Sequence, residues 1–114
     1  MAAILPYSDV NIDLAAAELR KGSVVAFATE TVYGLGADTF NPEAIAKIYE
    51  LKRRPTGNPL IAHVVDLASA RRVSTGWTRR SMNLISACWP GPLTIILPRR
   101  PEVPAIAAGG YDTI

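Results

Sequence analysis

The stretch Leu51-Lys52-Arg53-Arg54-Pro55-Thr56-Gly57-Asn58-Pro59-Leu60 connects a predicted helix to a predicted strand. The helix begins with Asn41 as its cap and Pro42 at its first position, and it ends in three consecutive cations. The two prolines restrict the loop backbone, and Gly57 permits a turn that other residues disfavour. Because the apolar run 60–65 follows at once, we expect the cations to lie on a stiff loop beside a strand end. That arrangement suits a ligand with several negative charges, such as a nucleotide triphosphate.

Helical and extended patterns alternate before and within this region. Asn11 is the expected cap of a helix over residues 12–21, and the apolar run 23–28 predicts a strand buried on both faces. A loop is expected over residues 29–36. The buried stripe expected on the helix after Asn41 consists of Ile45, Ile48 and Leu51.

The same alternation continues toward the C-terminus. Asp66 is expected to cap a short helix to about Val73, and Thr78 to cap another that stops at residues 89–92. Residues 93–97 predict a further strand, and residues 111–114 predict the first half of one more. The side chains expected to face inward from the helix after Thr78 are Met82, Ile85 and Trp89. Strands that alternate with helices indicate an α/β fold.

Length and composition limit the class of protein. At 114 residues, 49% of them apolar, the chain is long enough for one domain over residues 1–114 with a real core. A single cysteine, Cys88, excludes a disulfide framework and a cysteine-based zinc site, so we expect no metal ligands. The N-terminus does not resemble a secretory signal, and no apolar run has membrane-spanning length, which favours a cytoplasmic protein without a membrane partner.

Charge is distributed unevenly along the chain. Residues 1–51 hold three basic and seven acidic side chains, whereas residues 52–114 hold nine basic and three acidic ones. One positive side that attracts anions is therefore expected. The simpler interpretation, which stays open, is a set of solvated surface charges. The basic groups are residues 52–54, Arg71-Arg72, Arg79-Arg80 and Arg99-Arg100.

The segment Thr29-Glu30-Thr31-Val32-Tyr33-Gly34-Leu35-Gly36 follows the first predicted strand. Ligands of open α/β sheets bind at the carboxyl ends of strands. Two hydroxyls, a tyrosine and two glycines suit a small polar ligand there, although a plain connecting turn explains the segment equally well. The Gly-x-Gly is not a dinucleotide fingerprint, because the third glycine is missing.

Four motifs in order give the chain a resemblance to the YrdC-like threonylcarbamoyl-AMP synthase family. That family has a strand ending in Thr-acidic-Thr-x-Tyr-Gly-Leu, a helix ending in Lys-x-Arg-Pro, a Pro-Leu strand and Trp-Pro-Gly-Pro-Leu-Thr. The matching segments here are Thr29 to Leu35, Lys52 to Pro55, Pro59-Leu60 and Trp89 to Thr94.

The resemblance implies a twisted open mixed sheet flanked by helices, and the activity of L-threonylcarbamoyladenylate synthase. L-threonine, bicarbonate (or CO2) and ATP are the implied substrates, with Mg2+ accompanying the nucleotide. The products are threonylcarbamoyl-AMP and pyrophosphate. A downstream threonylcarbamoyl-transferase complex then modifies an adenosine beside the tRNA anticodon.

The resemblance also assigns residues. Lys52, Arg54 and Asn58 match ATP-binding positions, and Thr31 matches a threonine-binding position. His63 matches a histidine near the threonine carboxylate, but a structural role for a lone histidine in an apolar strand stays equally open. Pro55 biases the Arg54 backbone away from helical geometry. Of the three consecutive cations at residues 52–54, which we call the basic trio, Arg53 is interpreted as the solvated member. Residues 89–92 are interpreted as a helix stop.

The chain departs from the family pattern in two places. Ala28 stands where the family usually has proline, and the Arg-x-Pro strand and Ser-x-Asn motif expected after residue 114 are not in the sequence. We therefore expect the N-terminal portion of the domain, inactive by itself and open to self-association through an unfinished sheet. Ser81-Met82-Asn83 is interpreted as a coincidence. The alternatives are a module that binds double-stranded RNA or tRNA, and a carbamoyl-transfer domain of a larger protein.

Overall fold

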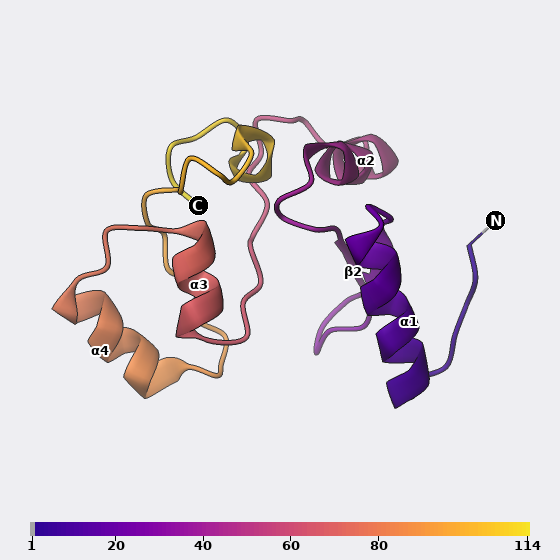
Figure 1. The fold of residues 1–114 in the computed structure, drawn as a ribbon, viewed down its shortest axis with the longest axis horizontal. Coiled ribbons are helices and arrows are strands. Elements are labelled where there is room, and N and C mark those ends of the chain that lie inside the picture. Colours follow the sequence, from indigo (N-terminus) through magenta and orange to yellow (C-terminus); the bar gives the residue numbers. More distant parts are fainter. Residues whose placement is uncertain (1) are drawn as a thin grey trace. The chain divides into compact units, whose positions relative to one another are not determined.

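The computed structural model describes residues 2–114 and divides into an N-terminal unit up to Arg54 and a C-terminal unit from Pro55 on. Helices and a small sheet are both present, so the predicted α/β class is confirmed (Figure 1). None of the helices in the described part of the chain is long and apolar enough to span a bilayer. The elements are α1 (Asp9–Arg20), β1 (Val25–Phe27), β2 (Gly34–Gly36), α2 (Pro42–Lys52), α3 (Leu67–Val73), α4 (Arg79–Cys88) and the 3-10 helix η1 (Ala105–Ala108).

Helix α1 begins earlier than the sequence pattern predicts. Ser8 is the cap, because its backbone is extended and its hydroxyl accepts a hydrogen bond from the Asn11 amide at 3.2 Å. The prediction that Asn11 caps the helix is wrong. Asn11 lies in the first turn, and its side-chain amide donates to the Pro6 carbonyl at 2.8 Å. Ser8 and Asn11 are both good caps, so composition alone could not choose between them.

Gly22 follows the end of α1 and also lies close to the start of α2. Its φ of +84° lies in the left-handed region, where glycine is favoured. The Gly22 carbonyl accepts a hydrogen bond from Lys47 Nζ at 2.8 Å. A Cβ atom at this position would lie only 2.8 Å from Asn41 Nδ2, so the missing side chain leaves room for the residue that caps α2.

Helix α2 starts as predicted, with Pro42 at its first position and Asn41 Oδ1 accepting from the Ala44 amide at 3.0 Å. Its buried side chains are Ala44, Ile45, Ile48 and Tyr49. Leu51, expected on this stripe, is 67% exposed, so that part of the prediction is wrong. At about 100° per residue, Leu51 lies about 120° around the helix from Ile45, whereas Tyr49 lies only about 40° away.

The strand predicted at residues 23–28 is present as β1, which is shorter and less buried than expected. Val25 is half-buried, and Phe27 is 41% exposed. Strand β2 pairs with β1 in antiparallel register, although a loop was predicted there. Because glycine is depleted in strands, the two glycines of β2 gave no strand signal in the sequence. The Phe27 ring packs against Gly36, where a Cβ atom would lie only 2.8 Å from the ring. Glycine at position 36 therefore leaves room for this ring.

The helices of the C-terminal unit, α3 and α4, start where their caps predict. Asp66 caps α3, and its carboxylate accepts from the Ser69 amide and hydroxyl, both at 2.7 Å. The Ser69 hydroxyl and amide hydrogen bonds lower the pKa of Asp66, so this cap stabilises the fold above the ordinary carboxyl pKa and is lost on acidification. Thr78 and Ser81 form a reciprocal capping box on α4. Ile85 is buried as predicted, and Met82 is half-buried.

The strands predicted at residues 60–65 and 93–97 have the right periodicity but are not strands in the structure. Leu60, Ala62 and Val64 are half-buried, whereas the alternate side chains, such as Ile61, are exposed. Residues 93–97 alternate in the same way. A strand also needs a hydrogen-bonded neighbour, and apart from Leu60 and Leu97 these runs have little main-chain pairing. The alternation predicts the faces of an extended segment and not its partner.

The end of the chain forms the pairing that residues 111–114 predict. Leu97 and Ile114 exchange two main-chain hydrogen bonds of 3.0 and 2.9 Å, and Pro98 and Thr113 form an antiparallel bridge. Residues 98–110 connect the two paired segments. This connection contains η1 and contributes three buried side chains to the core of the C-terminal unit, namely Val103, Ala107 and Ala108.

Candidate functional site

The loop between β1 and β2 carries Thr31 in an exposed position. The loop is closed by the Thr29 hydroxyl, which accepts from the amides of Thr31 and Val32 at 3.3 and 3.2 Å. The two threonine hydroxyl oxygens are 3.4 Å apart. Thr31 is therefore presented to solvent on a loop with internal hydrogen bonds. The sequence pattern did not single out Thr29 for this role.

The basic trio lies where α2 ends. Lys52 is the last helical residue, and Arg53 is left-handed with φ +48°, the one non-glycine residue with positive φ in the part of the chain described. The Arg54 amide then reaches back to the Tyr49 carbonyl at 2.9 Å, as in a Schellman-type helix end. Arg54 is non-helical as expected, but the left-handed turn occurs at Arg53. The three residues thus differ in backbone conformation: Lys52 is helical, Arg53 is left-handed and Arg54 lies outside the helix. Their side chains therefore start in different directions.

Arg54 differs from its neighbours in burial. Lys52 and Arg53 are exposed, whereas Arg54 is half-buried. Burial raises the pKa of the Tyr49 phenol, and the nearby positive charge of Arg54 partly offsets this rise. The Arg54 guanidinium therefore lies close to a buried side chain of α2.

Replacing Arg53 by glycine should stabilise the chain by about 0.5–1 kcal/mol, because a side chain in the left-handed region costs about 1–2 kcal/mol. Thermal unfolding followed by far-UV circular dichroism measures the change. The matched control is Lys52→Gly, one residue earlier inside the helix, which should destabilise by about 0.5–1 kcal/mol. Equal losses in both variants would contradict the assignment of Arg53 as the helix end.

Asn58 closes the loop that follows. Its amide donates to the Pro55 carbonyl at 3.0 Å, which makes residues 55–58 a four-residue turn. The Asn58 side chain is exposed. A Cβ atom on Gly109 would lie 2.9 Å from the Gly57 carbonyl oxygen, so the turn lies directly against the segment after η1.

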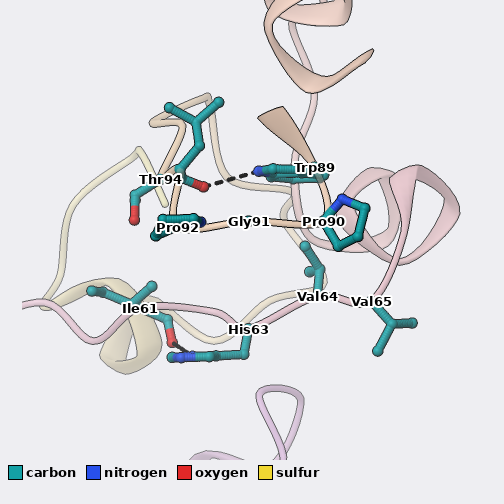
Figure 2. A pocket seen from close by; sticks show the side chains of 10 residues that line it. Ile61, His63, Val64, Val65, Trp89, Pro90, Gly91, Pro92 and Thr94 are labelled. Atoms are coloured by element: carbon teal, nitrogen blue, oxygen red, sulfur yellow. Dashed lines mark hydrogen bonds between the residues drawn. The ribbon is translucent and has the colours of Figure 1, made fainter. Parts of the chain in front are cut away.

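His63 lines a hollow of about 220 Å3 in the C-terminal unit (Figure 2). Its Nδ1 lies 3.2 Å from the Ile61 carbonyl oxygen, and this hydrogen bond requires the proton on Nδ1. Across the hollow, Trp89 Nε1 donates to the Leu93 carbonyl at 2.9 Å. Residues 89–92 stop α4 as expected, and they also form the second wall of this hollow, which the sequence did not indicate.

The predicted site residues thus fall into separate groups. Thr31, Lys52 and Arg54 belong to the N-terminal unit, where the hairpin loop and the end of α2 carry them. Asn58 and His63 belong to the C-terminal unit, on the turn and in the hollow. Within residues 2–114, no cluster of three His, Cys, Asp or Glu side chains is arranged to hold a metal ion.

Comparison with known proteins shows the family to which the chain belongs. The family model described as "Telomere recombination" matches residues 17–114, and the chain therefore belongs to the Sua5/YciO/YrdC family. The threonylcarbamoyl-AMP synthase of Bacillus subtilis is 46% identical over 107 residues, which are 92% of this chain and 31% of that protein. Its counterpart from Pyrococcus abyssi is 42% identical over 104 residues, again 31% of its length.

Solved structures give the same result for the fold. Pyrococcus abyssi Sua5 complexed with L-threonine matches with a TM-score of 0.89 and 39% identity, over 96% of this chain and 32% of that one. The MTH1692 protein of Methanobacterium thermoautotrophicum matches with a TM-score of 0.72 and 26% identity, over the whole chain and 54% of its own length. The chain thus spans about a third of the length of several of its relatives.

Proposed function

We propose that this chain provides binding elements for ATP and L-threonine in an L-threonylcarbamoyladenylate synthase. The observation that carries the proposal is the match to a structure described as a complex with L-threonine, at 39% identity over 96% of this chain. The reaction joins threonine, bicarbonate or CO2, and ATP, and it releases pyrophosphate. A separate transferase complex then uses the threonylcarbamoyl-AMP for tRNA modification. ATP and tRNA are cytoplasmic, so we place the protein there.

Lys52, Arg54 and Asn58 are the proposed ATP-binding residues. The reaction displaces pyrophosphate from the α-phosphorus, and negative charge develops on the phosphate oxygens. A planar guanidinium at Arg54 can donate two parallel hydrogen bonds to these oxygens, and Lys52 supplies a compact charge. We expect Mg2+ to accompany the triphosphate, since Mg2+ in nucleotide sites is bound largely through the phosphates of the substrate.

Thr31 and His63 are the proposed threonine-binding residues. The hydroxyl of Thr31 is exposed on a loop with internal hydrogen bonds, which suits contact with the polar groups of an amino acid. His63 has its proton on Nδ1 when bonded to the Ile61 carbonyl, and the hollow beside it is open to a small ligand. Its role as a purely structural residue is the competing hypothesis.

Replacing Thr31 by valine should weaken the binding of threonine more than the binding of ATP. The substitution keeps the shape and removes one hydroxyl, so a polar group of the ligand loses its partner at a cost of roughly 1–3 kcal/mol. Titration calorimetry with each substrate measures both effects. Thr31→Ser, which retains the hydroxyl, is the control, and an equal loss for ATP and threonine would contradict the assignment.

The proposed function is best tested in a chimaera. Residues 17–114 replace the matching segment of the Bacillus subtilis relative, and pyrophosphate release is measured with ATP, threonine and bicarbonate. We expect release that requires all three substrates, and only negligible release from the 114 residues alone. A folded chimaera that binds neither ATP nor threonine would contradict the proposal.

The alternatives are less well supported. Arg99 and Arg100 direct their guanidinium groups to main-chain carbonyls of the same unit, so both cations already have hydrogen-bond partners within the fold. Double-stranded RNA or tRNA binding, and a carbamoyl-transfer role, stay hypotheses. An RNA affinity that falls steeply with salt and ignores nucleotide would favour the first.

Self-association stays an expectation that the backbone supports. Within residues 2–114, the amides of Ile61, Ala62, Val64 and Val65 make no main-chain hydrogen bond, and neither do those of residues 94–96. Ile61, Val65 and Ile96 are 64%, 90% and 72% exposed. Extended backbone with free amides and exposed apolar side chains can pair with another strand.

A further inference from the structure

The Thr29 hydroxyl makes four contacts within one loop. It accepts from the Thr31 and Val32 amides at 3.3 and 3.2 Å, lies 3.4 Å from the Thr31 hydroxyl, and donates to the Val32 carbonyl, the shortest contact of the four. The Thr29 methyl group lies 3.7 Å from where a Cβ atom on Gly34 would stand, at the start of β2. One side chain therefore joins both ends of the loop.

Proton counting shows that the loop backbone saturates the Thr29 hydroxyl. A hydroxyl has one proton and two acceptor lone pairs. The Thr29 hydroxyl donates its proton to the Val32 carbonyl, and its two lone pairs accept from the amides of Thr31 and Val32. The contact of 3.4 Å between the two hydroxyls is the longest of the four, and no lone pair of Thr29 is left for it. The Thr31 hydroxyl therefore remains available to form a hydrogen bond with a polar group of a ligand.

We propose that Thr29 is a positioning residue that holds the loop so that the Thr31 hydroxyl is presented to the ammonium or hydroxyl group of an amino-acid ligand. Thr29 acts through Thr31 and the loop backbone and does not contact the ligand. This inference rests on the proposed function for the identity of the ligand, L-threonine. The orientation of the loop itself rests only on the contacts of Thr29.

The test compares Thr29→Val, which keeps the shape and removes the hydroxyl, with Thr29→Ser, which keeps the hydroxyl. Thr39→Val in the same unit is the matched control, because no hydrogen bond of the Thr39 side chain is present among the described residues. Titration calorimetry of the 114-residue chain with L-threonine and, separately, with Mg-ATP gives the affinities. Amide hydrogen exchange measured by NMR gives the order of the loop.

We expect Thr29→Val to weaken threonine binding about tenfold, with ATP affinity unchanged, and Thr29→Ser to stay within about threefold of the parent. Exchange of the Thr31 and Val32 amides should accelerate in Thr29→Val only. Threonine affinity unaffected by Thr29→Val, or reduced equally for ATP, overturns the proposal. If the unaltered chain binds no threonine at millimolar concentration, the proposed function fails for this chain. In that case the exchange of the Thr31 and Val32 amides still tests whether Thr29 orders the loop. Unchanged exchange of these amides in Thr29→Val overturns the positioning role.

Discussion

Replacing Arg54 by lysine should lower threonine-dependent pyrophosphate release by the chimaera at least about tenfold, or on the order of 1.4 kcal/mol of transition-state stabilisation. Lysine keeps the charge but cannot form two parallel hydrogen bonds to a phosphate. The half-buried position of Arg54 near the Tyr49 phenol limits the directions from which a shorter, flexible ammonium could compensate. Initial rates at fixed ionic strength measure the effect.

Arg53 is the matched control for this experiment, since it is the adjacent cation. Arg53→Ala should stay within about threefold of the parent, because its role is to turn the backbone. Arg53→Gly removes the same charge without the left-handed strain and separates charge from folding. Activity lost equally in Arg53→Gly and Lys52→Ala but retained in Arg54→Lys would show that the trio acts only as diffuse positive charge, and the RNA-binding hypothesis would gain.

Arg99→Met should destabilise the C-terminal unit by about 2–3 kcal/mol, because hydrogen bonds to a charged group contribute about 1.5–3 kcal/mol. The half-buried guanidinium donates to the Tyr111 carbonyl at 3.1 Å and to the carbonyls of Arg100 and Val103. It thereby ties both ends of the segment that contains η1. Methionine preserves much of the aliphatic volume and leaves these carbonyls without their donor.

Urea unfolding followed by tryptophan fluorescence measures this loss. Both tryptophans, Trp77 and Trp89, lie in the C-terminal unit and report on it directly. Arg100→Met is the control, because Arg100 Nε donates to a single carbonyl, that of Arg71, so its loss should be about 1 kcal/mol. Equal effects at the two positions would show that the several carbonyl contacts of Arg99 add nothing.

Local signals in the sequence located the helices well. The caps Asn41, Asp66 and Thr78 act within three residues of themselves, and each of them starts the helix that it predicts. Where two candidates lay close together, as Ser8 and Asn11 do, the choice depended on backbone angles that composition does not show.

Extended segments were harder to predict because pairing is not a local property. The alternation of residues 60–65 is real in the structure, yet it carries no information on which segment pairs with it. Strand β2 was missed for the opposite reason, since Gly34 and Gly36 have low strand propensity. Their small size lets the Phe27 ring of β1 lie against them.

The candidate site shows the same division. Motif matching could nominate Thr31, Lys52 and Arg54, because each is a residue type suited to its ligand. It could not identify Thr29, whose importance depends on contacts of the folded loop, or the left-handed backbone of Arg53. Similarly, residues 89–92 were recognised as a helix stop, while their place opposite His63 depends on tertiary structure (Figure 2).

The contact between Gly22 and Asn41 has a consequence for how sequences of this family can diverge. A side chain at position 22 would collide with the α2 cap, and it would also strain a backbone that is already left-handed. Position 22 therefore cannot change alone, since a bulkier residue there demands a smaller one at 41 together with a rebuilt turn. We therefore expect relatives that cap α2 with asparagine to keep glycine at position 22.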